Sequence, residues 1–200
     1  MKSKKTILIS FVALLIISII GLGFIFIQNN VPNGWFKAGN SPNSYEIGTE
    51  QNAGQKGENV VYIKSIEKNI KGFGTLMQSF SAEKYLNKRV RFSGDIKSEN
   101  VAESAGLWMR IDGKGSPIKT LEFDNMNNRP IKGTTNWKKY SVVLDVPDPS
   151  NMINIGFLLS GTGEIWVKNL KFEEVNKNVP TTDLMSEAQN KKEPVNLNFK

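Results

Sequence analysis

The sequence predicts an all-β domain, an antiparallel β-sandwich of jelly-roll type, preceded by one N-terminal transmembrane helix. Short runs in which apolar and polar residues alternate follow one another from Trp35 to Phe172, and clusters of Gly, Asn, Pro, Asp and Ser separate them. No long 3.6-residue period follows the N-terminal apolar run. Many short alternating strands with turns at this spacing are typical of sandwiches. We expect an anchor at 1–30, the β-sandwich at 31–175 and a polar, disordered tail at 176–200.

The N-terminal segment has the length and composition of a membrane span. Thr6 to Ile27 contains no charged residue, and as a helix of about 33 Å it would cross a hydrocarbon core of about 30 Å. Lysines at 2, 4 and 5 precede it and the next is Lys37, so the charge bias predicts a cytoplasmic N-terminus and an extracytoplasmic domain. A cleaved signal peptide usually has a shorter apolar region and a small-residue cleavage site. We therefore expect a single-pass, uncleaved anchor in the cell membrane.

The strands follow from alternation along the chain, and the last one carries an irregularity. Its residues Ile165 and Val167 lie on one phase, whereas Leu170 and Phe172 lie on the other, which predicts a β-bulge at Lys168 and Asn169. The predicted strands are 35–38, 44–49, 59–66, 74–80, 89–97, 107–112, 120–123, 139–146, 153–160 and 164–172.

Charge and composition exclude several classes of function. Net charge is +7, but three of these charges precede the apolar run. The dense basic group at 88–91 alternates with apolar residues, as the solvated face of a strand would, so we expect no nucleic-acid partner. The chain has no cysteine and no histidine, which excludes disulfides, the common nucleophile–base pairs and most transition-metal sites.

The candidate site lies on one face of the strand at 107–112. Leu107, Met109 and Ile111 form a core face, while Trp108, Arg110 and Asp112 share the other. We expect Leu121 and Phe123 to face the core, and Glu122 and Asp124 to face the groove. In this groove an indole would offer a flat surface to a sugar ring, and planar polar groups would satisfy its hydroxyls. The predicted ligand-binding residues are Trp108, Arg110, Asp124, Asn125 and Gln78, with Arg129 or Trp137 at the rim. We expect Trp108→Ala to abolish binding with little change in melting temperature.

Several motifs resemble a known family. The opening Gly34-Trp35, the run Asn136-Trp-Lys-Lys-Tyr140 and the run Gly163-Glu-Ile-Trp-Val-Lys-Asn-Leu-Lys-Phe-Glu173 are similar to galactose-binding-like jelly rolls, which include many carbohydrate-binding modules. The runs at 72–78, 107–112 and 123–126 resemble small uncharacterised bacterial jelly-roll proteins, some labelled transcriptional regulators. This sequence contains no helix-turn-helix pattern. The resemblance implies a carbohydrate ligand. Many such modules hold a structural Ca²⁺ near the last-strand bulge, but Lys168 stands there, so we expect no metal and no cofactor.

Three functions remain open, in order of preference. The first is a non-enzymatic module of the cell envelope that binds a carbohydrate or similar polar ligand. The second is a protein-interaction or sensory module with an envelope protein as partner, because an exposed aromatic residue with an arginine is also typical of interface hot spots. The third is a glycoside hydrolase that uses two of Asp112, Glu122 and Asp124. Binding is preferred over hydrolysis because a binding groove also needs hydrogen-bond acceptors, and these carboxylates can accept from ligand hydroxyls or pair with Arg110 and Arg129.

Overall fold

The computed structural model describes residues 31–50 and 58–185, which form one antiparallel, nine-stranded sheet. The prediction of an all-β, sandwich-like fold is confirmed. The predicted membrane segment lies outside the described residues, and within them no helix combines the length and apolarity that a membrane crossing needs. The strands are β1 (Phe36–Gly39), β2 (Tyr45–Glu50), β3 (Val60–Ser65), β4 (Phe73–Ser81), β5 (Arg89–Gly113), β6 (Thr120–Asp124), β7 (Ile131–Asp145), β8 (Ser150–Ser160) and β9 (Glu164–Val175).

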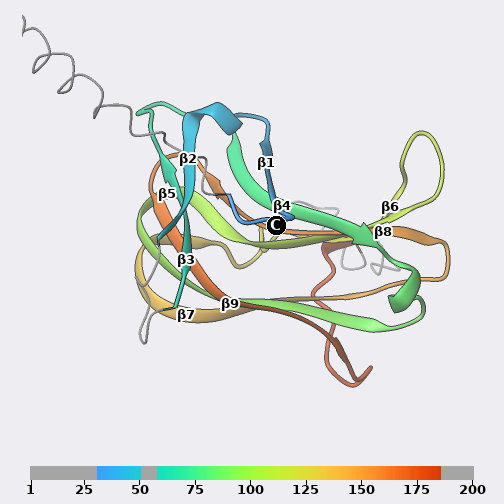
Figure 1. Cartoon of the computed structure of the whole chain (residues 1–200). Coiled ribbons are helices and arrows are strands. Elements are labelled where there is room, and N and C mark those ends of the chain that lie inside the picture. Colours follow the sequence, from blue (N-terminus) through green and yellow to red (C-terminus); the bar gives the residue numbers. More distant parts are fainter. Residues whose placement is uncertain (1–30, 51–57, 186–200) are drawn as a thin grey trace, which may run out of the picture. The chain divides into compact units, whose positions relative to one another are not determined.

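Strand β5 joins two layers because its two halves pair with different neighbours. Residues 89–99 pair with β9, and β7 pairs along residues 89–105. Residues 104–113 pair with β8 on one side, and residues 109–112 pair with β6 on the other. The first layer is therefore β1, β4, β8, the second half of β5, and β6. The second layer is β7, the first half of β5, β9, β3 and β2. In Figure 1, β4 and β8 run above β7 and β9.

The continuity of β5 differs from the prediction of separate strands at 89–97 and 107–112. The polar residues between them remain paired with β7, at Ser98–Thr135, Val101–Gly133 and Ala105–Ile131, with shifts of register between these pairs. Such irregular pairing bends a strand without ending it. It also explains why β7 begins at Ile131 and not at 139 as predicted.

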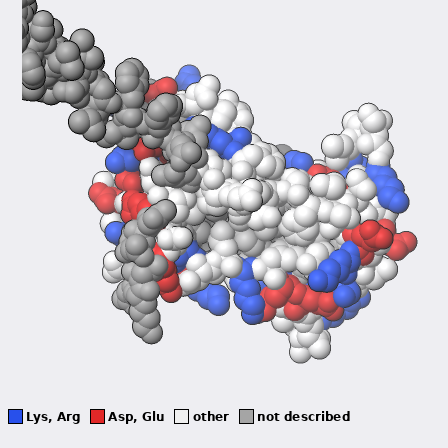
Figure 2. Space-filling model, in the orientation of Figure 1, with Lys and Arg blue, Asp and Glu red and all other residues white. Residues whose placement is uncertain are grey.

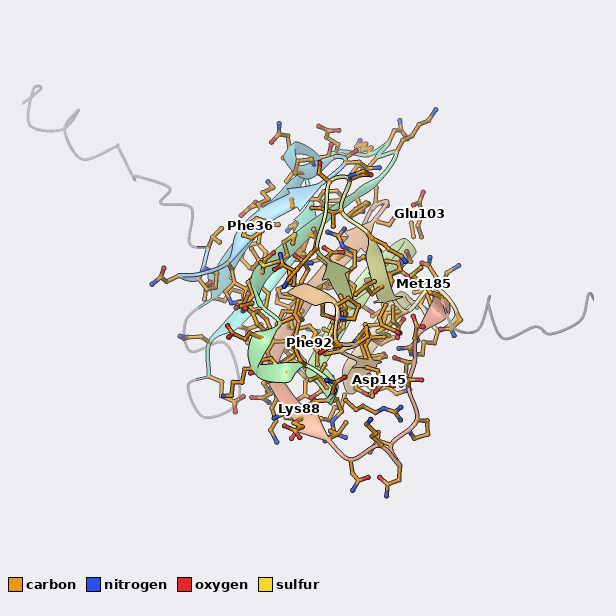
Figure 3. The ribbon with its side chains drawn as sticks, turned by 90° about the vertical axis from the view of Figure 1, so that its right-hand side faces the viewer. Phe36, Lys88, Phe92, Glu103, Asp145 and Met185 are labelled. Carbon is orange, nitrogen blue, oxygen red and sulfur yellow. The ribbon has the colours of Figure 1, made fainter. Side chains whose placement is uncertain are left out.

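The core lies between the layers and follows the predicted alternation. Leu107, Met109 and Ile111 are completely buried, and they belong to the same apolar cluster as Phe92 and Ile96 from the first half of β5. Figure 3 shows Phe92 among the strands, with Lys88 and Glu103 toward opposite ends of the molecule. Burying each such side chain contributes about 1.5–3 kcal/mol. Because both halves of β5 contribute side chains to this one core, their burial stabilises the arrangement in which the halves lie in different layers.

The predicted bulge in β9 is confirmed. Asp95 pairs with Lys168 and Ser93 pairs with Lys171, so two β9 residues, Asn169 and Leu170, lie opposite Gly94 alone. A Cβ atom on Gly94 would lie 2.6 Å from the Leu170 side chain. Glycine at this position therefore leaves the space into which the bulge turns Leu170.

The basic run at 88–91 lies beside acidic partners. Lys88 pairs with Glu174 at 2.8 Å, Arg89 with Asp145 at 2.8 Å and Arg91 with Glu173 at 2.6 Å. Figure 2 shows basic and acidic side chains intermixed near the edges of the described surface, whose middle is mainly uncharged. The run therefore forms ion pairs across the sheet, as expected of a strand's outer face.

The expectation of a disordered tail from residue 176 is wrong for residues 176–185. The amide of Thr182 donates to the carbonyl of Val143 at 2.8 Å, and the amide of Val143 donates to the Thr182 hydroxyl at 2.9 Å. Polar composition predicted disorder, but here polar side chains pair with the backbone of an edge strand. Residues 186–200 lie outside the described residues.

Candidate functional site

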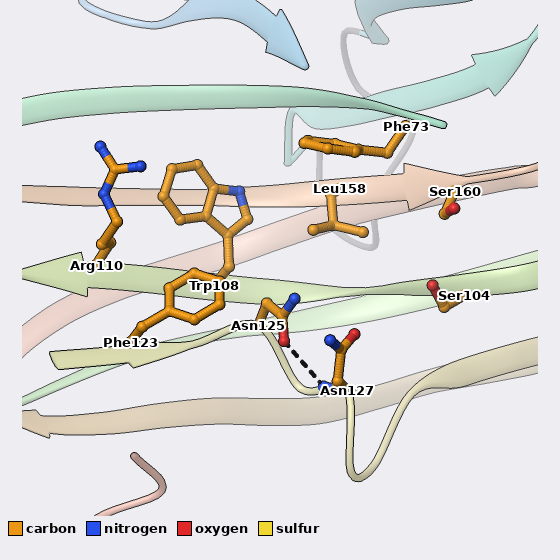
Figure 4. Close-up of a pocket in the computed structure, with 9 residues that line it drawn as sticks. All are labelled: Phe73, Ser104, Trp108, Arg110, Phe123, Asn125, Asn127, Leu158 and Ser160. Carbon is orange, nitrogen blue, oxygen red and sulfur yellow. Dashed lines mark hydrogen bonds between the residues drawn. The ribbon is translucent and has the colours of Figure 1, made fainter. Parts of the chain in front are cut away.

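A recess of about 320 Å³ opens on the outer face of the first layer. Its aromatic and polar lining includes Phe73 from β4, Trp108 and Arg110 from β5, Phe123 from β6, and Asn125 and Asn127 from the loop after β6 (Figure 4). Leu158, Ser160 and Ser104 line the rest. A mixed apolar and polar lining of this kind is typical of small-ligand sites.

Strand register explains why these residues meet. Arg110 lies directly opposite Phe123, and Trp108 lies opposite Gly156 of β8. Directly opposed residues share one face of a sheet, so Trp108, Arg110 and Phe123 all point away from the core. The predicted orientation of Trp108 and Arg110 away from the core agrees with this geometry.

The indole of Trp108 is packed into the wall of the recess and is only 7% exposed. Its Nε1 donates a hydrogen bond to Thr75 Oγ1 at 2.8 Å. A Cβ atom on Gly156 would lie 2.7 Å from Nε1, so the ring covers the space that this glycine leaves. The expectation of an open aromatic platform is therefore wrong, because the indole is fixed and largely covered by the protein.

Two phenylalanines are the more accessible rings of the recess. Phe73 and Phe123 are half-buried, and Figure 4 shows the Phe123 ring below the indole and the Phe73 ring above Leu158. The sequence placed Phe123 in the core, which is wrong, and it did not single out Phe73 as a site residue. The pairing of Phe123 with Arg110 was the missing signal, and it depends on a register that the sequence does not specify.

Arg110 is anchored on one edge and open on the other. Its Nε and Nη2 donate to Asp112 Oδ2 at 3.1 and 2.9 Å, and Asn154 Nδ2 donates to the same oxygen at 2.8 Å. Within 31–50 and 58–185, Nη1 has no hydrogen-bond acceptor. The guanidinium extends alongside the indole (Figure 4) and can donate to a bound molecule from this free side.

Asp124 faces the interior, contrary to its expected place in the groove. Its side chain is 0% exposed, and Arg129 contacts it with Nη1 to Oδ1 at 3.2 Å and Nη2 to Oδ2 at 2.5 Å. Asp124 Oδ1 also accepts from the amide of Met126 at 2.7 Å. This buried pair fixes the loop that presents Asn125 and Asn127. The groove assignment of Asp124 is therefore wrong, and Arg129 is a support of the loop that does not line the recess.

The loop amides complete the polar lining. Asn125 Oδ1 accepts from the amide of Asn127 at 3.2 Å, the contact drawn in Figure 4. Each side-chain amide carries both donors and acceptors, which suits the hydroxyl groups of a sugar. Asn125 lies where the sequence placed it, whereas Asn127 was not selected because nothing in its local pattern separates it from a turn residue.

Two predicted residues lie elsewhere. Gln78 pairs with Ile155, which pairs with Met109, so Gln78 faces the interior side of the first layer. Trp137 belongs to β7 in the second layer, is 39% exposed, and has Lys168 Nζ at 4.9 Å from its ring. The structure therefore brings neither residue to the recess.

The three candidate carboxylates do not converge. Asp112 is held by Arg110, and Asp124 is buried with Arg129. Glu122 lies opposite Ile111 on the interior side, where burial, and then a hydrogen bond with Asp183, raise its pKa to about 8. A glycosidase needs two carboxyl groups flanking one substrate bond, and these three side chains do not provide such a pair.

The bulge region contains a lysine where the resemblance implied a metal ligand. Lys168 Nζ pairs with Glu58 at 2.9 Å. In the described part of the chain, no group of three or more acidic, histidine or cysteine side chains could hold a metal ion.

Comparison with known proteins finds one that is similar in sequence over most of this chain. The chain is 44% identical over 167 residues to an uncharacterised HTH-type transcriptional regulator, YbfP, of Bacillus subtilis strain 168. The match covers 83% of this chain and 56% of that protein, so the chain spans just over half the length of the relative. No family model matches the sequence. Within 31–50 and 58–185, helical structure beside the strands is limited to short 3₁₀ helices and the two α-helical residues Leu184 and Met185, and these ranges contain no helix-turn-helix.

Solved structures similar in fold include carbohydrate-binding modules. One is the CBM22-1–GH10 part of xylanase Xyn10B from Clostridium thermocellum, complexed with xylohexaose (TM-score 0.50, 10% identity, 70% of this chain and 26% of that one). Another is the active domain of tailspike protein 4 of bacteriophage CBA120 (TM-score 0.50, 10% identity, 72% and 20%). The CBM22-1 xylan-binding domain of Paenibacillus barcinonensis Xyn10C has a TM-score of 0.49 and 14% identity, and the match covers 74% of this chain and 89% of that one. At such identities the likeness concerns the fold alone.

Proposed function

We propose that this protein is a non-enzymatic module that binds a carbohydrate chain in the recess on the first layer. The carrying observation is the convergence of two half-buried rings, Phe73 and Phe123, with the free side of the Arg110 guanidinium. The jelly-roll type of the sandwich is part of the same proposal. The fold shared with carbohydrate-binding modules supports it.

The chemistry of the recess suits a sugar. Apolar ring surfaces can pack against the C–H face of a pyranose, while its hydroxyls need paired donors and acceptors. Arg110 supplies donors, and Asn125 and Asn127 supply both donors and acceptors. Because Arg110 is already held by Asp112, little side-chain freedom is lost when a ligand accepts from it, which favours affinity.

We further propose that the module works outside the cytoplasm, attached to the cell membrane by Thr6 to Ile27. The apolar run and the preceding lysines support this orientation. An extracytoplasmic module would meet the glycans of the cell envelope, so the proposed ligands are polysaccharides of the wall or of its surroundings.

Titration calorimetry on the full-length chain in detergent tests the proposal. The panel is xylohexaose, β-1,4-galactotriose and soluble fragments of bacterial cell-wall glycan. We expect saturable binding of at least one member, and Arg110→Met to weaken it by about tenfold, the effect of losing a charged hydrogen bond of about 1.5 kcal/mol. Lys114→Met, an exposed substitution outside the recess, is the matched control. Absence of binding across the panel and a wider glycan array would contradict the proposal.

A further inference from the structure

Residues 177–185 contact three strands, beginning at Arg89, the first residue of β5. Arg89 Nη1 donates to the carbonyls of Lys177 and Val179 at 2.8 and 2.5 Å. Its Nε and Nη2 donate to Asp145 at 2.9 and 2.8 Å. One guanidinium thus ties the start of this segment to β5 and to the end of β7. We call residues 177–185 the strap.

The strap reaches β6 through Asp183, which is buried at 4% exposure. Asp183 Oδ1 accepts from the amide of Phe123 at 3.0 Å and from the amide of Met185 at 3.0 Å. Between the two ends, Thr182 exchanges hydrogen bonds with Val143 of β7. The strap therefore bridges β7 and β6.

The contact with Phe123 connects the strap to the recess. β6 pairs with β5 alone among the described strands, so its other edge is where Asp183 binds. The amide that Asp183 holds belongs to the same residue whose ring lines the recess. An edge strand of five residues with one strand partner depends on such a contact for its position.

We propose that Asp183 is a positioning residue for the glycan site: by holding the amide of Phe123 it sets the place of the Phe123 ring, so that binding depends on docking of the strap. This inference rests on the proposed function and adds the coupling of the site to the C-terminal segment. Asp183 acts through Phe123 and does not itself line the recess.

The charges around Asp183 give this coupling a pH dependence. Glu122 of β6 lies beside it, and burial together with the hydrogen bond to Asp183 raises the pKa of Glu122 to about 8. Asp145 of β7 also faces this pair, and Arg89 lowers the pKa of Asp145 and binds it. Lys177 of the strap faces Asp145. When Glu122 ionises, a second negative charge lies beside Asp183 and disfavours docking. The chain has no histidine, so no imidazole titrates in this range.

Two readouts on the full-length chain test the inference. One is calorimetric affinity for soluble cell-wall glycan fragments, and the other is hydrogen exchange of the Phe123 amide without ligand. Asp183→Ala should weaken binding about two- to tenfold, the effect of one hydrogen bond of about 0.5–1.5 kcal/mol, and speed exchange at Phe123. Asp183→Asn keeps an acceptor and should restore most of the affinity. Asp148→Ala, at an exposed aspartate, is the matched control.

The pH profile separates positioning from general stability. Protection of the Phe123 amide, corrected for the intrinsic exchange rate, should fall as pH rises through about 8, and Glu122→Gln should remove this step. If protection of the Phe123 amide falls in the same way in Glu122→Gln, the inference is overturned. This test remains available even if Asp183→Ala fails to fold. If Phe123→Ala weakens binding but a folded Asp183→Ala does not, the positioning role alone is contradicted. If neither variant matters, the recess is not the site and both proposals fail.

Discussion

The indole Nε1 of Trp108 donates to the hydroxyl of Thr75 at 2.8 Å, and that hydroxyl donates in turn to the carbonyl of Phe157 at 2.7 Å. Trp108 lies on β5, Thr75 on β4 and Phe157 on β8, the strand between them. The two bonds thus join three strands across the wall of the recess. Because a buried indole N–H needs a partner, this relay makes Trp108 a structural part of the site.

Trp108→Ala should destabilise the fold by about 3–5 kcal/mol, the usual cost of truncating a buried tryptophan. Trp108→Phe should cost about 1–3 kcal/mol, because it keeps a ring but leaves the Thr75 hydroxyl without its donor. Urea denaturation followed by far-UV circular dichroism measures both. A fully stable Trp108→Ala would restore the sequence-based expectation that the ring is dispensable for folding.

Gly156→Ala should destabilise the protein, because the added methyl group would collide with the Trp108 indole that forms the wall of the recess. The added Cβ would lie 2.7 Å from Trp108 Nε1 and 2.6 Å from the carbonyl oxygen of Leu76, so we expect a loss of about 1–3 kcal/mol from overpacking. Gly113→Ala is the matched control, because the atoms nearest to its Cβ would be those of the Leu121 side chain at 3.4 Å, an ordinary van der Waals contact. Thermal unfolding of the two variants makes the comparison, and equal melting temperatures would show that the ring moves freely.

Arg129→Ala should be strongly destabilising, because it leaves the Asp124 carboxylate buried and uncompensated. Removing one partner of a buried ion pair costs about 3–5 kcal/mol. Lys171→Ala breaks a surface pair with Glu173 and should cost much less, because solvent screens the attraction between exposed charges. Denaturant titration of both variants tests this difference. Similar small losses would mean that the loop after β6 is held by other contacts.

Stability should fall with increasing pH because of Glu122. Its pKa is raised from an ordinary value of 4.5 to about 8 in the folded protein, so the folded state holds a proton that the unfolded state has lost. This contribution is fully present below about pH 4.5 and is lost progressively as pH rises to about 8. Melting temperatures across this range should show the decline, and Glu122→Gln should reduce it. An identical pH profile in the variant would place the titration elsewhere.

Local alternation was sufficient to predict most of the fold. The phase change between Val167 and Leu170 predicted the bulge, because two apolar pairs on opposite phases cannot both face one core without an inserted residue. The core face of Leu107, Met109 and Ile111 followed from the same rule. The continuity of β5 did not, since the pairing of Ser98 and Val101 with β7 is a non-local property of the chain.

The site was predicted only in part, because burial of a polar residue depends on partners elsewhere. The alternation rule put Phe123 inside and Asp124 outside, whereas the structure reverses both. Arg129 compensates the charge of Asp124 inside the fold, and the register with Arg110 turns Phe123 outward. The burial of Trp108 likewise depends on Gly156, a residue of another strand that nothing in the local sequence links to it.

The most direct test of glycan binding in this recess is the affinity of Phe123→Ala beside that of Trp137→Ala. Phe123 lines the recess, while Trp137 is an exposed aromatic residue of the second layer. In calorimetry with soluble cell-wall glycan fragments, we predict that Phe123→Ala weakens binding about tenfold or more, as expected for loss of a stacked ring, and that Trp137→Ala binds like the wild type. Loss of binding in Trp137→Ala with full affinity in Phe123→Ala would contradict the account.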